Sequence, residues 1–563
     1  MKLSDRIKRF FYPEAGSPRW MFILPYTTLI ILFIGVAFGG IHTWEYTNSN
    51  QFCGTACHTM PPQSIAFLES PHSNVTCEEC HIGRASFVDQ AIRKTQGLKE
   101  AYYEIFNLYE YPIRAKALRP SVDTCEKCHR PETFADDSLR QIHRFKNDVD
   151  NTATSTYLIM KTGGVDARLG DARGIHWHIS SKVLYYAEDD LAQVIPYVRV
   201  YNEDGTYTGY TDVESGFDPS TVDESQLKQM DCITCHNRIT HSFDAPYKSM
   251  DEAMAKGLID PSIPLIHHKA VKALVTRYTS REEAMAAIAS IEDEYKQDYS
   301  DFYSQNGQII KEAIVEIQVI YDRTVFHEQE IDWTTYPNNL GHMDSPGCFR
   351  CHDGKHLNQD DEAVRLECNI CHAIPVVAKA DDFLTTIEIS RGPIPETHLN
   401  PNWISMHNQV MGASCSNCHT TKDPGGTSNT SFCSNSACHG NAFTFAGFDA
   451  PALREIIKSQ LPPPELELEI PLLIGDPTFN NYIGILFTVK CAKCHEGESA
   501  SQDLDLTTFA SAMAGGENGR VILPGSAANS LLVQIQQEDH FANFTNDELD
   551  NVIHWIESGA PED

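Results

Sequence analysis

Eighteen cysteines constrain this 563-residue chain more than any other feature, because they form nine pairs and a histidine directly follows each pair. Seven pairs are spaced as C-x-x-C-H, and the first and eighth are longer by one and two residues. In C-x-x-C-H, the two thiols form thioethers with a haem and the adjoining histidine binds its iron as an axial ligand. The pattern predicts a c-type cytochrome with nine covalently attached haems. The nine motifs, numbered in chain order, are Cys53/Cys57/His58, Cys77/Cys80/His81, Cys125/Cys128/His129, Cys232/Cys235/His236, Cys348/Cys351/His352, Cys368/Cys371/His372, Cys415/Cys418/His419, Cys433/Cys438/His439 and Cys491/Cys494/His495.

Zinc and disulfides are the two alternative explanations for so many paired cysteines. A structural zinc site takes four ligands from two knuckles and needs no histidine fixed directly after each pair. A disulfide framework needs no such histidine either, and it is typical of chains much smaller than this one. Because no cysteine is left over, the two longer motifs are predicted to bind haem as well.

Size and charge limit the fold and the partners. A chain of this length is expected to hold about three to five domains. It has 44 Lys and Arg residues against 77 Asp and Glu residues, a formal net charge of −33. So acidic a surface repels phosphate groups, which argues against a nucleic-acid partner. The charge alone names no protein partner, and it leaves the oligomeric state open.

Residues 21–41 are apolar and uncharged, and five basic residues against two acidic ones precede them. A helix of this length spans about 31 Å, enough to cross the hydrocarbon core of a bilayer. The basic flank predicts a cytoplasmic N-terminus, with all haem motifs on the periplasmic or extracytoplasmic side of the inner membrane. Trp20 and Trp44 stand at either end, where interface anchors are expected. A cleavable signal peptide is the alternative, but its apolar region would be shorter.

We expect a mainly α-helical multihaem cytochrome with irregular, haem-organised segments, a small β-hairpin and a single transmembrane helix. Three proline residues in a row after Leu461 are expected to stiffen a linker. The predicted parts are a cytoplasmic tail (1–19), a transmembrane anchor (20–43), a four-haem domain (44–250) with an insertion (144–230), a helical scaffold segment (251–335), a second four-haem domain (336–450), a linker (451–474) and a monohaem cytochrome c-like domain (475–563).

Local patterns support these divisions. Residues 194–210 alternate around an N-E-D-G turn, which predicts a β-hairpin. In the cysteine-free segment, Asn306-Gly307 is expected to break one helix, and residues 546–558 predict an amphipathic helix near the C-terminus. An apolar stripe at helical spacing is predicted to face a core rather than a cofactor. The stripe consists of Ile310, Ala313, Ile314, Ile317 and Tyr321.

A low-spin electron-transfer haem needs a second axial ligand, usually His or Met. Fifteen of the 24 histidines stand outside the motifs, enough for nine irons, and no C-x-x-C-K motif occurs. This number of candidate ligands favours haems with two axial ligands, which transfer electrons, over catalytic haems with an open ligand position. Candidates that lie close to a motif are His241, His342, His356 and His407, and His143 and His327 are added from the same set.

The stretch from the apolar segment to motif 4 resembles the NapC/NirT/NrfH family of membrane-anchored quinol dehydrogenases. The resemblance rests on the N-terminal span, Cys57-His58-Thr59-Met60, Ser70-Pro71-His72 and the motif 4 sequence C-I-T-C-H-N-R-I-T-H that ends at His241. It implies a first haem at the membrane surface beside a quinol site, with Met60 or His58 as its ligand. It also implies that His72 and His241 are distal ligands of other haems.

Two departures from the family limit this transfer. The extra residue in motif 1 leaves the choice between His58 and Met60 open. The long insertion between motifs 3 and 4 is not typical of the family, so its Gly174-Ile175-His176-Trp177-His178 segment has no counterpart from which a role can be carried over.

The stretch from Arg93-Lys94 to Lys99-Glu100 resembles the basic-then-acidic stretch that lines the quinol pocket in NrfH-like proteins. Quinol oxidation releases two protons with two electrons, so such a site needs groups that accept protons. Lys94 and Glu100 are the candidates. The alternative is a solvated helix face with ordinary charge pairs.

The last segment is similar to small monohaem cytochrome c domains, on the basis of motif 9, Gly515-Gly516 and residues 523–525 and 555–561. Such domains usually place a Met before the last helix. Here that region offers His540, with Met513 further upstream. We predict His540 as the distal ligand, since His is the commoner partner in this chain.

Together these patterns predict a membrane-anchored nonahaem cytochrome that takes electrons from (mena)quinol and passes them through its haems to a periplasmic or extracytoplasmic redox partner. Whether it is itself an enzyme, as a quinol dehydrogenase, stays open. One alternative is a terminal reductase of a small nitrogen or sulfur oxyanion with one five-coordinate haem, placed at motif 1 or 8. Another is a structural conductor in an extracellular assembly, against which the uncleaved anchor argues.

Overall fold

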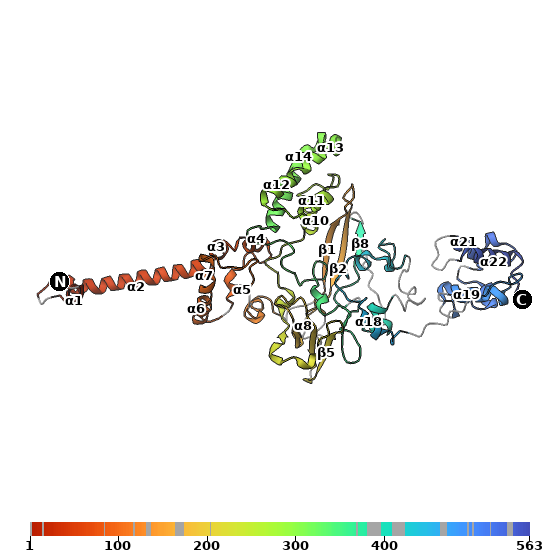
Figure 1. Ribbon diagram of the computed structural model, residues 1–563, viewed down its shortest axis with the longest axis horizontal. Coiled ribbons are helices and arrows are strands. Elements are labelled where there is room, and N and C mark those ends of the chain that lie inside the picture. Colours follow the sequence, from red (N-terminus) through yellow and green to blue (C-terminus); the bar gives the residue numbers. More distant parts are fainter. Residues whose placement is uncertain are drawn as a thin grey trace.

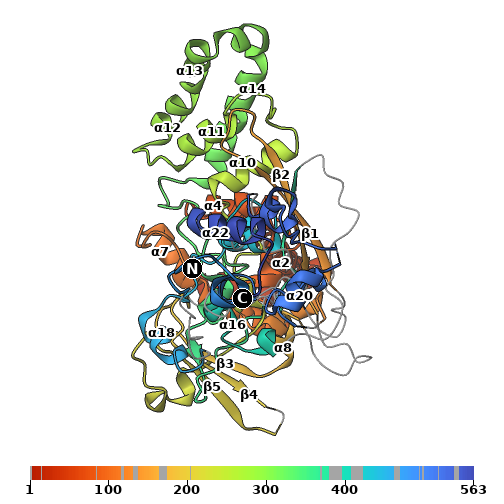
Figure 2. The same ribbon diagram turned by 90° about the vertical axis from the view of Figure 1, so that its right-hand side faces the viewer.

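The computed structural model is elongated, with the long helix α2 (Arg19–Asn48) at one end and the C-terminal helices, including α19 (Gly484–Lys490) and α22 (Asn546–Glu557), at the other (Figure 1). Seen along its length, a block of helices stands on one side of the haem-motif region and a small sheet on the other (Figure 2). The residues described are 3–13, 16–83, 85–115, 119–130, 137–163, 174–202, 204–367, 370–379, 396–407, 423–461, 470–492, 495–497, 500–517, 519–537 and 544–563.

The helix α2 follows the short helix α1 (Leu3–Phe11) and contains the predicted span. It continues to Asn48, so its 30 residues extend about 45 Å at 1.5 Å per residue. Its large apolar side chains are exposed, with Phe33 and Val36 each 74% exposed. In the described part of the chain, α2 is the one helix long and apolar enough to cross a membrane. The expected apolar anchor helix is therefore present.

Short helices and turns surround motifs 1 to 4. Several begin at a polar cap: Ser86 accepts a hydrogen bond from the Asp89 N–H, and the Asp231 carboxylate accepts from the N–H groups of Ile233 and Thr234. The elements are α3 (Asn50–Thr55), α4 (Pro61–Glu69), α5 (Cys77–His81), α6 (Phe87–Gln96), α7 (Leu98–Ile105), η1 (Ser121–Asp123), η2 (Cys125–Lys127), α8 (Trp177–Ser180), η4 (Pro219–Thr221), η5 (Glu224–Gln226) and α9 (Cys232–Cys235).

Among the described residues, two small antiparallel sheets lie in the middle of the molecule. The predicted hairpin is confirmed, because β4 pairs with β5 up to Tyr201 opposite Tyr207. The three-stranded sheet has the order β1-β2-β8, and the five-stranded sheet has the order β6-β3-β4-β5-β7. The strands are β1 (Ser138–Phe145), β2 (Ala153–Met160), β3 (Val183–Tyr186), β4 (Tyr197–Tyr201), β5 (Tyr207–Asp212), β6 (Lys228–Gln229), β7 (His356–Leu357) and β8 (Val376–Lys379).

Both sheets join segments that lie far apart in the chain. β8 pairs with β2, placing Val377 opposite Thr156, and β7 pairs with β5, placing His356 opposite Asp212. The predicted insertion therefore forms sheets with the segment that carries motifs 5 and 6. These pairings bring the two groups of haem motifs together across the cysteine-free helical segment that separates them in the sequence.

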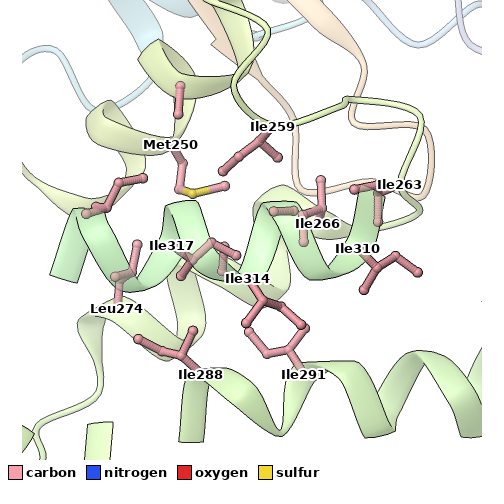
Figure 3. Packing of buried hydrophobic residues seen from close by; sticks show 14 of the residues in the cluster. Met250, Ile259, Ile263, Ile266, Leu274, Ile288, Ile291, Ile310, Ile314 and Ile317 are labelled. Atoms are coloured by element: carbon pink, nitrogen blue, oxygen red, sulfur yellow. The ribbon is translucent and has the colours of Figure 1, made fainter. Parts of the chain in front are cut away.

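The cysteine-free segment forms a block of five helices with its own apolar core (Figure 3). In Figure 3, Ile310, Ile314 and Ile317 of α14 point towards residues of the neighbouring helices. All five residues of the predicted stripe are at most 7% exposed, which confirms that the stripe faces a core. Asn306 has non-helical angles (φ −125°, ψ 18°), so the expected break is a kink within one long helix. The helices are α10 (Pro246–Ala255), α11 (Ile266–Val275), α12 (Arg281–Ala289), α13 (Ile291–Asp298) and α14 (Ser300–Thr324).

The C-terminal segment has a second apolar core, built around Trp555, which is fully buried and donates its indole N–H to the Pro561 carbonyl at 2.9 Å. The predicted helix is confirmed as α22, and a capping box between Thr545 and Glu548 begins it. The remaining elements are η6 (Gly347–Arg350), α15 (Glu396–Leu399), α16 (Trp403–Met406), η8 (Phe432–Ser434), α17 (Ser436–His439), α18 (Pro451–Ile457), the π-helical turn η9 (Phe479–Ile483), η11 (Ser501–Asp503), α20 (Phe509–Ala514), η12 (Ala527–Asn529) and α21 (Leu531–Gln536).

The helical block can be tested by Ile317→Ala. Ile317 is 0% exposed, so its truncation leaves a cavity and should lower the opening free energy of α14 by about 2–5 kcal/mol. Native-state hydrogen exchange of the full-length protein measures that free energy directly. Val315→Ala is the matched control on the same helix, because Val315 is 59% exposed. Equal effects of the two substitutions would contradict the packing described above.

Candidate haem sites

Several of the described motifs lie on single helical turns. A helical turn places residues three apart on the same face, so the two cysteines of a C-x-x-C pair point the same way. α5 carries motif 2, and α9 carries motif 4. The cysteines of motifs 1 to 5, and Cys371 of motif 6, are free thiols, as attachment to haem requires.

In motifs 3 and 5 the second cysteine is the C-cap residue of a 3-10 turn, and in motif 8, one of the two longer motifs, the two cysteines belong to separate turns. Cys128 of motif 3 lies just after η2, as its C-cap residue, and is exposed, whereas Cys125 begins η2 and is half-buried. In motif 8, Cys433 belongs to η8 and Cys438 to α17, because the two extra residues begin a new turn between them. The N–H groups of Cys128 and Cys438 donate to the carbonyls of Cys125 and Asn435, at 3.1 and 3.0 Å.

The assignment of the motif cysteines as haem-attachment residues, Cys128 and Cys438 included, depends on the motif spacing and stays a prediction. His439, which ends α17, nevertheless occupies the place of an axial ligand, as the histidine pairs below show.

Some predicted site residues lie outside the described residues, and their assignments stay predictions. They are Cys368, Cys415, Cys418, His419, Cys494 and His540. The predicted linker residues 462–469 also lie outside.

Within the part of the chain that the structure describes, six motif histidines face a second histidine. Two metal–imidazole bonds of about 2 Å on opposite sides of one metal place the ring centroids roughly 6 Å apart. The observed separations match that spacing, so the residues fit an iron bound between each pair of rings. The pairs, with their centroid distances, are His81–His241 (6.2 Å), His72–His129 (6.0 Å), His176–His236 (6.4 Å), His178–His352 (5.7 Å), His342–His372 (6.3 Å) and His407–His439 (6.3 Å).

Backbone carbonyl groups orient these rings. A histidine whose Nδ1–H donates to a carbonyl presents the lone pair of Nε2, which is the form that binds a metal. The contacts between Nδ1 and a carbonyl oxygen are His241 with Gln63 (3.0 Å), His178 with Ile175 (2.7 Å), His352 with Arg365 (2.7 Å), His342 with Ala442 (2.8 Å), His372 with Ala373 (2.8 Å), His407 with Ile404 (2.8 Å) and His176 with Gly163 (3.3 Å).

Burial keeps several of these imidazoles neutral, the protonation state that a ligand needs. Burial lowers the pKa of His241 to about 4, and the positive charge of Arg238 adds to the effect. Burial likewise lowers the pKa of His352 to about 4, with a further contribution from His178. Both side chains are therefore uncharged at neutral pH.

Four of the predicted distal ligands, His72, His241, His342 and His407, lie opposite a motif histidine. Three others have protein partners instead. Both ring nitrogens of His356 are hydrogen bonded, to Asp353 and to the Ile195 carbonyl. The Nδ1 atom of His143 lies 3.3 Å from the Ser155 hydroxyl, and the Nε2 atom of His327 lies 3.0 Å from the Tyr321 hydroxyl. Both nitrogens of His356 and the Nε2 atom of His327 therefore have protein partners, so the geometry does not support these two assignments. The contact of His143 leaves its Nε2 atom available, and its assignment stays a prediction.

His176 and His178 take the positions opposite His236 and His352, which the sequence left without a named partner. Both belong to the fifteen spare histidines, but neither is adjacent in sequence to a motif. The sequence feature that could have pointed to them is their spacing, because two histidines separated by one residue can reach two neighbouring sites. Its meaning depends on strand pairings between distant segments, which the sequence does not reveal.

Motif 1 differs from the paired sites. The Nδ1 atom of His58 lies 2.6 Å from Oε1 of Glu104, and its backbone N–H donates to the same oxygen at 2.5 Å. The Glu104 side chain is only 10% exposed, and its other oxygen accepts a hydrogen bond from the Thr59 hydroxyl at 3.1 Å. Met60 precedes α4 and is half-buried. The Glu104 carboxylate therefore contacts the histidine of motif 1.

The two predicted quinol-site residues lie in different surroundings. The Lys94 ammonium lies 4.4 Å from the ring centroid of Trp44 and donates to the Thr47 hydroxyl at 3.0 Å, both at the end of the anchor helix. Burial lowers the pKa of Lys94. Glu100 is exposed, and its backbone carbonyl accepts a hydrogen bond from the Tyr109 hydroxyl. The assignment of Lys94 and Glu100 to a quinol site stays a prediction, and Glu104 is the carboxylate that contacts motif 1.

Consecutive motifs are spatial neighbours from motif 1 to motif 6. The Cys53 and Cys77 thiols are hydrogen bonded to each other. Thiols of the later motifs interact electrostatically, in the pairs Cys80–Cys125, Cys125–Cys232, Cys235–Cys348 and Cys348–Cys371. The contact of His342 with Ala442 brings the motif 6 pair beside motif 8. From motif 1 to motif 6, the order of the sites in space thus follows their order in the chain.

A buried guanidinium connects motifs 4 and 5. Arg350 of motif 5 is 7% exposed and donates to the carbonyls of Thr234 in motif 4 (2.8 Å), Ala192 (2.8 Å) and Gly347 (2.9 Å). A positive charge in such a low-dielectric position stabilises the less positive, reduced state of a nearby redox centre.

The C-terminal site is described in part. His495 of motif 9 has its Nδ1 atom 3.1 Å from the Leu504 carbonyl, the same orientation as in the paired sites. Met513, the alternative distal ligand, packs against the C-terminal core.

Comparisons with known proteins agree with these sites. Residues 18–122 match the N-terminal region of the NapC/NirT cytochrome c family, and residues 491–540 match Planctomycete cytochrome C. Cytochrome c-type protein ImcH of Geobacter sulfurreducens is 35% identical over 406 residues, which cover 71% of this chain and 78% of that protein. No solved structure matches the chain.

Shorter relatives match the N-terminal part. Cytochrome c-type protein NapC of Escherichia coli K12 is 32% identical over 137 residues, 23% of this chain and 66% of that protein. Cytochrome c nitrite reductase subunit NrfH of Nitratidesulfovibrio vulgaris is 30% identical over 88 residues, 16% of this chain and 52% of that protein.

The apolar N-terminal helix, the haem motifs and the facing histidines define a multihaem c-type cytochrome of the membrane. Within that class, the chain belongs to the family of ImcH and carries a NapC/NirT-type N-terminal region. The resemblance noted from the sequence is confirmed. Membership of a cytochrome c family implies covalently bound haem c, whereas the number nine stays a prediction from the motifs.

The role of Arg350 can be tested by Arg350→Met. Loss of a buried positive charge should lower the reduction potentials of the haems at motifs 4 and 5 by on the order of 60 mV, a tenfold change in a one-electron equilibrium. Spectroelectrochemical titration of the full-length protein measures the shift. Arg350→Lys keeps the charge and should shift the potentials much less. If both variants shift them equally, the guanidinium acts through its hydrogen bonds and not through its charge.

Proposed function

We propose that this protein oxidises a membrane quinol, such as menaquinol, at the outer face of the cytoplasmic membrane. The electrons then pass through nine haems to a periplasmic or extracytoplasmic redox partner. The observation that carries this proposal is the row of histidine pairs at motifs 2 to 6, which follows motif 1 and the anchor helix in the order of the chain. Family membership supports it, because NapC and NrfH are relatives of the N-terminal part and ImcH is a relative over 71% of the chain.

Motif 1 lies beside an apolar surface that continues from the anchor. Trp44 of α2 contacts Phe87 of α6, with ring centroids 4.8 Å apart. α6 and α7 expose large apolar side chains, here called the membrane-facing surface, which soluble domains rarely leave in one patch. Helices of this kind lie in the interface of a bilayer. The residues are Phe87, Val88, Ile92, Leu98, Tyr102, Ile105 and Phe106, each at least 53% exposed.

Oxidation of one quinol releases two electrons and two protons. Glu104, held against His58, and Lys94, beside Trp44 and Thr47, are the groups suited to accept the protons. The lowered pKa of Lys94 favours its neutral, proton-accepting form more than that of an ordinary lysine. Glu104 replaces Glu100 in this assignment, because Glu104 contacts motif 1 and Glu100 is exposed.

Each bound haem c supplies a one-electron carrier. The paired histidines at motifs 2 to 6 and 8 would hold haem irons from both sides, which would keep substrates away from the metal. The pair at motif 8 argues against an open haem there, one of the two places proposed for a terminal reductase site. The motif 9 segment, at the far end from α2 in Figure 1, is the exit towards the partner.

The proton-accepting role of Glu104 can be tested by Glu104→Gln. Removal of a general base should slow haem reduction by a menaquinol analogue by about 100-fold, while reduction by dithionite stays unchanged. Stopped-flow absorbance of the protein in proteoliposomes measures both rates. Glu100→Gln is the matched control, one helical turn away on α7, and should have little effect. The opposite order of effects would restore Glu100 as the carboxylate of this site.

The membrane-facing surface can be tested with the double variant Ile92→Asp/Ile105→Asp. Two charges on this surface should lift motif 1 from the bilayer and slow quinol-dependent reduction several-fold, because burying charge in lipid is unfavourable. Val149→Asp is the control, since Val149 is similarly exposed but lies in the β1–β2 turn. An unchanged quinol-dependent rate in the double variant would place the quinol entrance elsewhere.

A further inference from the structure

A short segment of the insertion reaches two haem motifs at once. It is Gly174-Ile175-His176-Trp177-His178, here called the H-x-H segment, and its last two residues begin α8. His176 faces His236 of motif 4, and His178 faces His352 of motif 5. The two histidines are separated by one residue, so one rigid piece of backbone is shared by two neighbouring sites.

The His178 pair has the geometry of two ligands on one metal. The two Nε2 atoms, one from each ring, are 3.5 Å apart and face each other. Both Nδ1 atoms face backbone carbonyls, that of Ile175 for His178 and that of Arg365 for His352, at 2.7 Å each. With Nδ1–H as donor, each Nε2 presents its lone pair to the gap between the rings. The two ring planes cross at 87°.

The His176 pair differs in orientation. Its rings are 6.4 Å apart and nearly parallel, at 24°, and Nδ1 of His176 lies 3.3 Å from the Gly163 carbonyl. The two sites of the H-x-H segment therefore combine one nearly parallel pair and one nearly perpendicular pair of rings.

The backbone of the H-x-H segment is held from both sides. The N–H groups of Ile175 and His176 donate to the carbonyls of Lys161 and Thr162, at 2.8 and 3.1 Å. Gly174 has φ +74°, and a Cβ atom there would lie 2.3 Å from the Lys161 carbonyl oxygen, so only glycine fits this approach. Trp177 packs against the apolar cluster that contains Cys351 of motif 5.

Motifs 4 and 5 are also joined directly beneath this segment. Asn237, which follows His236, donates to the Pro337 carbonyl at 2.9 Å, and Asn339 donates to the Thr234 carbonyl at 3.0 Å. The Cys235 and Cys348 thiols are electrostatic neighbours. The H-x-H segment thus lies across the junction between the N-terminal motifs and the later ones.

We propose that His176 and His178 are the distal axial ligands of the haems at motifs 4 and 5, and that the H-x-H segment fixes the two haems at the distance over which electrons cross from the N-terminal group to the second group. The insertion therefore provides the electronic connection between the two groups. This inference deepens the proposed function and rests on it only for the direction of electron flow, because the ligand assignment needs no quinol.

The test uses the ferric full-length protein and electron paramagnetic resonance, without any quinol. Nearly perpendicular imidazole planes give a strongly anisotropic low-spin signal, and nearly parallel planes give a rhombic one. His178→Gly should lose one haem equivalent of the strongly anisotropic signal, and His176→Gly should lose one haem equivalent of the rhombic signal. Each loss should appear as a high-spin signal, and added imidazole should restore the low-spin signal by filling the vacated position.

His268→Gly is the control, because His268 is exposed on α11 and should leave the spectrum unchanged. His176→Met and His178→Met guard against misfolding, since a thioether can still bind the iron; each should raise the potential of one haem in a redox titration. Haem content per chain is measured for every variant. If the glycine and methionine variants leave the low-spin signals and all potentials unchanged, the assignment is wrong.

A second measurement separates this proposal from the proposed function. In proteoliposomes with a menaquinol analogue, His178→Met should still allow rapid reduction of the haems before motif 5, with the later haems reduced more slowly. If the unsubstituted protein is not reduced by quinol at all, the proposed function fails while the ligand assignment from the ferric spectra stands. If the later haems of His178→Met are reduced as fast as in the unsubstituted protein, the H-x-H segment does not lie at the crossing point.

Discussion

The hydrogen bond from a histidine Nδ1 to a backbone carbonyl is the interaction on which the haem sites depend. Where it is present, it fixes both the tautomer and the ring direction, and in the His178–His352 pair the two Nε2 atoms face each other at 3.5 Å. His241, His342 and His407 all have this contact, although they come from segments with no common sequence. The carbonyls belong to the short helices α4 (Gln63) and α16 (Ile404) and to a turn (Ala442), so a region with few long helices can still hold these rings in defined positions.

The sequence predicted the elements whose determinants are local. The haem motifs, the apolar anchor, the stripe of α14 and the capped helix α22 each depend on residues within one or two turns of each other. Four of the histidines that lie opposite a motif histidine were also within reach, because proximity to a motif or family resemblance pointed to His72, His241, His342 and His407. The contact of Glu104 with His58 was not predicted, since it depends on how α7 lies against motif 1.

The contacts of His356 and His178, which the sequence did not predict, have a common physical cause. His356 is close to motif 5 in sequence, but Asp353 and the Ile195 carbonyl take both of its ring nitrogens. His178 is far from that motif in sequence, yet pairing of β5 with β7 and of β2 with β8 brings the insertion against it. Strand pairings between segments more than a hundred residues apart are set by the whole fold, so no local pattern reveals them.

The two larger apolar cores of the described residues lie in the helical block around Ile317 and in the C-terminal segment around Trp555, while the region of motifs 1 to 6 has only small clusters. Without its macrocycles, that region lacks the buried apolar surface that holds a fold together. The core of the helical block contains no haem-motif residue, whereas the C-terminal core includes Cys491 of motif 9. Maturation should therefore proceed from a chain whose helical block is already compact to one whose motif region becomes ordered as the thioether bonds form. The accessible cysteines of that immature region are then what the haem-attachment machinery encounters.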